Sequence, residues 1–187
     1  MYVNPDTGAV VLVPPRTASR TIAAALMGAG WVADRGHHFV HPEVLARAPW
    51  VAVSVRNHWD QLASWYTSRP QRLDLGAWFD EWYGEDIIRS VADHGMGRYV
   101  TERGLYAKWL CHPSLHVVPE LIRFENLAED LEAATGVHLG GHRVSDRTSH
   151  RRGRHYSLLY TEQARHAVAD RFADEIARLG YSFELVT

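Results

Sequence analysis

Residues suited to binding an oxyanion gather near the start of the chain. Two arginines, Arg16 and Arg20, alternate with two hydroxyl residues, Ser19 and Thr21. Guanidinium groups and hydroxyls donate hydrogen bonds that match phosphate or sulfate oxygens. Taken alone, this stretch fits an anion site and a buried turn with solvated arginines equally well.

The pattern around these residues predicts a strand, a tight turn and a helix. The apolar run Val10–Val13 is followed by two prolines, which is typical of a buried strand in a parallel sheet. The apolar spacing over residues 22–26 predicts a helix, which we expect Ser19 or Thr21 to cap. Such a turn places backbone N–H groups and the positive end of a helix at one point, which favours an anion.

A second predicted strand also ends at an arginine. Residues 50–55 form an apolar run, Arg56 follows it, and Asn57 can cap the next helix. Ligands of parallel α/β sheets bind beyond the carboxyl ends of the strands, and Arg16 and Arg56 each follow such a predicted strand end. Ser64, on the following helix, could reach the same phosphate as Arg56. Alone, Arg56 is equally well a surface cap and Ser64 a packing hydroxyl.

The segment from residue 36 to residue 41 offers histidines for proton transfer near neutral pH. Neighbouring residues of an extended segment point to opposite sides, so one of His37 and His38 faces the site. We favour His37 slightly. The alternative is that these are ordinary loop histidines, and a metal site that also uses His41 would lack an acidic partner in this segment.

The rest of the chain completes an alternation of strands and helices. Asn126 and Gly136 bound a predicted helix over residues 127–135, and Thr161 precedes a last helix. The apolar stripe of that last helix consists of Ala164, Val168, Phe172 and Ile176. We therefore expect an α/β fold, with a central parallel sheet flanked by helices, in a single domain over residues 1–187.

A polar loop before the last helix is rich in arginine, including Arg151, Arg152 and Arg154. It could close over a nucleotide, follow a nucleic-acid backbone or be a solvated loop. The formal net charge of −2 argues against a globally basic nucleic-acid binder. Cys111 is the one cysteine, so no disulfide framework is expected, and no signal or membrane segment is evident. We expect a cytoplasmic protein with no membrane partner.

Four segments in order carry a resemblance to a known family. They are Leu12-Val-Pro-Pro-Arg-Thr-Ala-Ser-Arg-Thr-Ile22, Val53-Ser-Val-Arg-Asn-His-Trp-Asp-Gln-Leu-Ala-Ser-Trp-Tyr66, Leu121-Ile-Arg-Phe-Glu-Asn-Leu127 and the C-terminal residues 156–183. The chain resembles the sulfotransferases that use 3′-phosphoadenosine 5′-phosphosulfate (PAPS). The resemblance implies a P-loop-like, three-layer α/β/α fold.

It also implies a function and a set of site residues. The 5′-phosphosulfate would bind to Arg16, Thr17, Ala18, Ser19, Arg20 and Thr21, and the 3′-phosphate to Arg56 and Ser64. Arg151, Arg152 and Arg154 would cover the nucleotide. Arg16 and one of His37 and His38 would be catalytic, the histidine as general base. A sulfuryl group would pass from PAPS to a hydroxyl or amine of a small molecule or glycan, leaving 3′-phosphoadenosine 5′-phosphate (PAP), with no metal required.

Other functions stay open beside this one. Arg16 stands where the family usually has a lysine, and an arginine stabilises charge but is a poor proton donor. A non-catalytic module that binds PAP or PAPS is therefore one alternative. A nucleotide-dependent kinase is another, although residues 15–21 contain no glycine and no lysine for a phosphate-binding P-loop. The sequence does not identify the acceptor or the oligomeric state.

Overall fold

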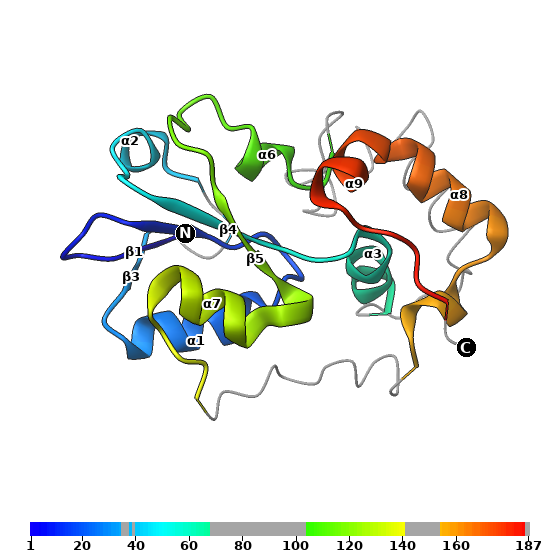
Figure 1. Ribbon diagram of the computed structural model, residues 1–187, viewed down its shortest axis with the longest axis horizontal. Helices are drawn as coiled ribbons and strands as arrows, with labels where there is room; N and C mark the ends of the chain where they lie inside the picture. Colours follow the sequence, from blue (N-terminus) through cyan, green and yellow to red (C-terminus); the bar gives the residue numbers. More distant parts are fainter. Residues whose placement is uncertain (35–37, 39, 68–103, 141–153, 186–187) are drawn as a thin grey trace. The chain divides into compact units, whose positions relative to one another are not determined.

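The structure is a computed structural model that describes residues 1–34, 38, 40–67, 104–140 and 154–185 (Figure 1). The chain divides into two compact units. Unit 1 consists of Met1–Arg56 and Lys108–Asp146, and unit 2 of Asn57–Ala107 and Arg147–Thr187. The short helix α6 (Ala107–Leu110) spans the sequence boundary between them. The single domain over residues 1–187 stays a prediction.

Unit 1 is built on a five-stranded mixed sheet. Its strands are β1 (Tyr2–Val3), β2 (Val10–Leu12), β3 (Val32–Ala33), β4 (Val51–Val55) and β5 (Glu120–Arg123), in the order β3-β1-β2-β4-β5. β2, β4 and β5 are parallel, as expected. β1 is antiparallel to both β2 and β3, so the expectation of a wholly parallel sheet is wrong at this edge. The reason is that the turn after β1 is tight: the Asn4 side chain accepts from two backbone N–H groups, which returns the chain directly alongside β1.

The core of unit 1 lies between the sheet and two helices, α1 (Ser19–Gly28) and α7 (Leu127–Thr135) (Figure 1). Buried side chains of both helices and of the sheet form one cluster, which includes Val11, Ile22, Leu26, Ala52, Ile122 and Leu131. Alternate residues of β2 and β4 point to the opposite face and are buried as well. Burial on both faces explains why these two strands read as continuous apolar runs.

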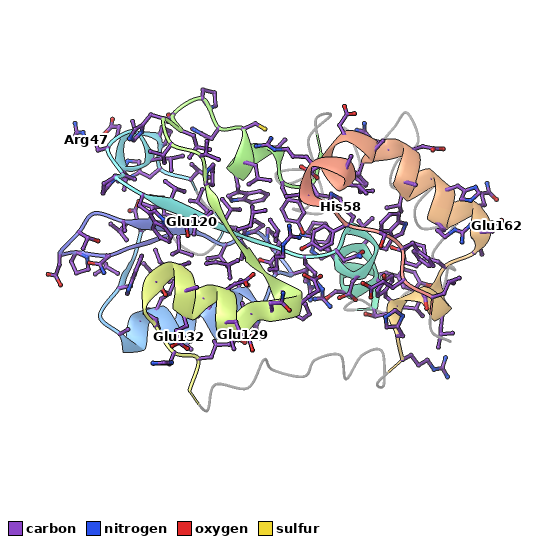
Figure 2. The ribbon with its side chains drawn as sticks, viewed as in Figure 1. Arg47, His58, Glu120, Glu129, Glu132 and Glu162 are labelled. Carbon is purple, nitrogen blue, oxygen red and sulfur yellow. The ribbon has the colours of Figure 1, made fainter. Side chains whose placement is uncertain are left out.

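Shorter elements complete unit 1. Helix α2 (Pro42–Leu45) begins with the expected proline, and the 3₁₀ turn η1 (Phe124–Asn126) leads from β5 into α7. Gly136 ends α7 in a left-handed conformation, as predicted. The indole of Trp50 donates to a carboxylate oxygen of Glu120 at 2.8 Å, joining the starts of β4 and β5 (Figure 2).

Unit 2 contains α3 (His58–Thr67), the 3₁₀ turn η3 (Tyr156–Leu159), α8 (Glu162–Arg171) and α9 (Ala173–Leu179). The side chains of Asn57 and Thr161 accept from the first-turn N–H groups of α3 and α8, which confirms these two predicted caps. Asn126 occupies the N-cap position of α7, but its side chain makes no capping hydrogen bond. The prediction of a single last helix is wrong, because the helix is interrupted at Phe172, between α8 and α9. No helix of the described ranges is long and apolar enough to cross a membrane.

Candidate functional site

The loop between β2 and α1 is held in a costly backbone conformation. Arg16 and Ala18 both have positive φ angles, of 67° and 63°. This left-handed region disfavours residues with a Cβ atom, and the loop contains no glycine. Two such residues in one short loop mark it as a strained turn of the kind that occurs at binding sites.

This loop delivers the chain to the uncapped start of α1. Ala18 occupies the N-cap position, so the expectation that Ser19 or Thr21 caps the helix is wrong. The left-handed turn at Ala18 brings the chain into the helix at Ser19 itself. No side-chain cap and no acidic residue occupies the first turn of α1. Its positive end therefore lacks a negative partner of its own in the described structure, which suits an anion.

Thr17 links the loop to β4 through a buried hydrogen bond. Its side chain is fully buried, and its hydroxyl donates to the Pro14 carbonyl at 2.7 Å. A second hydroxyl, that of Ser54 on β4, lies 2.6 Å from the Thr17 oxygen. Since Thr17 has given its hydrogen to Pro14, Ser54 is the donor in this second bond. The predicted ligand role of Thr17 is thus limited to its backbone.

Arg56 reaches the same loop from the end of β4. It is 5 % exposed, and one guanidinium nitrogen donates to the carbonyl of Arg16 at 3.0 Å. The guanidinium carbon Cζ lies over the Phe124 ring, 3.8 Å from its centre, within reach of a cation–π interaction. Arg16 and Arg56 are thus in contact through the backbone carbonyl of Arg16, and their roles as ligand-binding residues stay predictions.

His38 also lies beside the loop. Its Nδ1 is 2.8 Å from the carbonyl of Val13, the residue that follows β2. A carbonyl can only accept, so Nδ1 carries the hydrogen and Nε2 is the ring atom that can take up a proton. His37 lies outside the described residues, so the preference between the two stays a prediction. His41 pairs with Asp34 at 3.0 Å, an acidic partner just outside the segment considered above.

The other predicted nucleotide contacts fall in different parts of the chain. Ser19 is half-buried, Arg20 is exposed and Thr21 is buried, all in the first turn of α1. Ser64 is half-buried on α3 and belongs to unit 2, so a phosphate shared with Arg56 stays a prediction. Arg154 is exposed just before η3, while Arg151 and Arg152 lie outside the described residues.

Unit 2 holds a buried pair that the sequence did not reveal. Nε2 of His58 lies 2.8 Å from the carboxylate of Glu175, which also accepts from the backbone N–H groups of Leu105 and Tyr106 (Figure 2). His58 is fully buried, and its Nδ1 has no hydrogen-bond partner among the described residues. The complete burial separates this imidazole from any ligand in this conformation, so we assign the pair to the packing of unit 2.

Sequence reasoning also missed two residues of the loop site. Ser54 gave a signal, since it is the one polar residue in the run from 51 to 55. Phe124 gave none beyond its place in a recognised segment, because its role depends on the approach of β5 to the end of β4.

Comparisons with known proteins do not assign this chain to a family. A scan against protein-family models, a search of curated proteins and a search of solved structures found no match. In the described residues, no group of three or more His, Cys, Asp or Glu side chains is placed to hold a metal ion. What the fold defines is an α/β chain with a strand, a strained loop and an uncapped helix start in unit 1.

Proposed function

We propose that this chain is a sulfotransferase that moves a sulfuryl group from PAPS to a hydroxyl or amine. The observation that carries the proposal is the uncapped start of α1, which contains Arg20 and is preceded by the strained loop with Arg16. Backbone N–H groups, a helix dipole and guanidinium groups at one point are the features that bind a phosphosulfate. The proposal includes a P-loop-like fold and a cytoplasmic location.

The reaction assigns a role to each part of the loop. The acceptor oxygen or nitrogen attacks sulfur in line, and the bond from sulfur to the bridging oxygen breaks. Its electron pair stays on the phosphate of PAP, where the Arg16 side chain and the start of α1 stabilise the charge. The proton of the acceptor passes to a histidine base, for which Nε2 of His38 is the described candidate.

The remaining predicted contacts belong to the nucleotide. Arg56 and Ser64 bind the 3′-phosphate in this proposal, and Arg151, Arg152 and Arg154 cover the adenosine. The acceptor is a small molecule or a glycan.

The second candidate is a module that binds PAP or PAPS without turnover. The presence of Arg16 in place of a lysine favours it, because an arginine does not readily donate a proton to a leaving group. A nucleotide-dependent kinase is the third candidate, and nothing in the loop favours it over the first two.

A ligand titration separates these candidates. The full chain is titrated calorimetrically with PAP, AMP, ATP and GTP, each with and without magnesium. We expect PAP to bind most tightly and its affinity to be independent of magnesium. Preference for ATP with magnesium would refute the sulfotransferase and the binding module together.

Two variants test the site, and one serves as a matched control. Arg16→Ala should weaken PAP binding about tenfold, the usual scale for one charge-assisted contact. Arg47→Ala, at an exposed arginine in the turn that follows α2 in the same unit, should bind PAP as the natural chain does (Figure 2). Transfer of labelled sulfate from PAPS to a mixed acceptor extract then distinguishes enzyme from module. His38→Gln should abolish transfer while PAP binding is kept.

A further inference from the structure

Arg56 contacts other residues of unit 1. Its guanidinium donates to the Arg16 carbonyl at 3.0 Å and stacks 3.8 Å from the centre of the Phe124 ring. The ring fixes the plane of the guanidinium, and the plane fixes the direction of its N–H groups. Arg56 is therefore aimed at the backbone of the loop by a side chain from η1.

The same strand contacts the loop a second time. Ser54 lies on β4, and Arg56 is the residue directly after this strand. β4 is parallel to β2, so the ends of the two strands lie next to each other. Ser54 holds Thr17, and Arg56 holds Arg16. Ser54 of β4 and Arg56 directly after it thus contact consecutive residues of one turn.

The residue that Arg56 contacts, Arg16, is one of the two residues of the loop with a positive φ angle. Arg16 has a φ of 67°, which a residue with a Cβ atom leaves readily for an extended or right-handed conformation. Rotation of the peptide that follows Arg16 would carry its carbonyl away from the guanidinium. A charge-assisted hydrogen bond to that carbonyl therefore opposes the relaxation of the loop.

We propose that Arg56 is a positioning residue for the loop, which it holds in the left-handed turn that aims the Arg16 side chain and the start of α1 at the anion. This role is separate from any contact of Arg56 with a 3′-phosphate. It rests on the proposed function for the identity of the anion, but its effect on the loop exists without ligand.

The first test uses the ligand-free, full-length chain. Amide hydrogen exchange is followed by NMR at residues 16–22 in Arg56→Ala, Arg56→Lys and Phe124→Leu, with Arg47→Ala as control. We expect exchange in this segment to accelerate about tenfold in Arg56→Ala, as for the loss of one charge-assisted bond. Arg56→Lys should not restore protection, because an ammonium group has no plane to stack on Phe124. Phe124→Leu should accelerate exchange in the same segment, and the control should not.

The second test compares two nucleotides that differ at the 3′ position. Affinities for PAP and for AMP, which lacks the 3′-phosphate, are measured for the natural chain and for Arg56→Ala. A positioning role predicts that the variant loses about tenfold in affinity for AMP as well as for PAP. A role confined to the 3′-phosphate predicts that AMP binding is unchanged.

The outcomes separate this inference from the proposed function. Unchanged exchange at residues 16–22 in Arg56→Ala would overturn the positioning role, and so would unchanged affinity for AMP. Accelerated exchange in a chain that binds neither nucleotide would support the positioning role and refute the sulfotransferase. Full recovery of protection in Arg56→Lys would assign the effect to charge alone and would also overturn the inference.

Discussion

Replacement of Thr17 by valine should destabilise unit 1 strongly, although the two side chains have nearly the same volume. The change removes the hydroxyl that donates to Pro14 and accepts from Ser54. Each bond contributes about 1 kcal/mol net, and a buried partner left without a bond costs about 1–3 kcal/mol. Since Thr17 and Ser54 are fully buried and Pro14 is buried, water cannot replace the lost bonds without rearrangement. We expect Thr17→Val to cost roughly 2–4 kcal/mol of unfolding free energy.

A double-mutant cycle gives this expectation its test. Urea unfolding is measured for Thr17→Val, Ser54→Ala and the double variant, with Thr17→Ser as a control that keeps the hydroxyl. Ser54→Ala alone should cost about 1 kcal/mol, and almost nothing when Thr17 is already valine, because its partner is gone. Thr17→Ser should cost about 1 kcal/mol, for one buried methyl group. Additive losses in the cycle, or equal losses for valine and serine, would refute the hydroxyl pair.

Three other perturbations test the structure away from this pair. Gly104→Ala should cost about 3 kcal/mol of unfolding free energy in urea, because Gly104 has a φ of 137° and the new Cβ would press on the Glu175 carboxylate. Unchanged stability of this variant would contradict the close approach of Gly104 to Glu175. Burial raises the pKa of Tyr2 to about 12, so its contribution to stability is full below pH 10 and is lost as the pH rises through 12. Tyr2→Phe should therefore flatten the decline of stability over that range, and an unchanged slope would count against it. Burial and the Lys108 ammonium group lower the pKa of His112, so Lys108→Gln should raise it in an NMR titration, and no shift would exclude the charge effect.

Much of unit 1 could be predicted because its elements carry local signals. Apolar runs next to prolines or an arginine predicted β2 and β4, and Gly136 predicted the end of α7. β1 could not be predicted, since two residues have no periodicity and their pairing depends on the turn that follows. For the same reason, the antiparallel edge of the sheet could not be predicted.

The end of the chain shows how a correct stripe can mislead. Ala164, Val168 and Phe172 are buried as the spacing predicts. The break at Phe172 then changes the face of the chain that is buried, so Glu175 lies inside and Ile176 is half-buried. A buried carboxylate is stable there because two backbone N–H groups and His58 satisfy it. These donors lie 69 to 117 residues away in the sequence, which no local pattern can reveal.

At the candidate site, residue types were predictable and their conformations were not. The arginines after two predicted strands could be read from the sequence, and the structure shows that these strands are adjacent and that Arg56 contacts the backbone of Arg16. Left-handed backbone at Arg16 and Ala18 could not be predicted, because a turn of this kind normally announces itself with glycine.

The absence of glycine from this loop gives a physical reason for the hydrogen bonds that Ser54 and Arg56 make to it. Two residues with a Cβ atom in the left-handed region cost about 2–4 kcal/mol together. A glycine would remove that cost, but it would leave the loop free to adopt many conformations before a ligand arrives. Hydrogen bonds from Ser54 and Arg56 offset a cost of this size, each bond to a charged group contributing about 1.5–3 kcal/mol and the neutral one about 1 kcal/mol. Contacts from the neighbouring strand therefore hold the loop in its left-handed conformation without a ligand, which is the preorganisation that the proposed binding role requires.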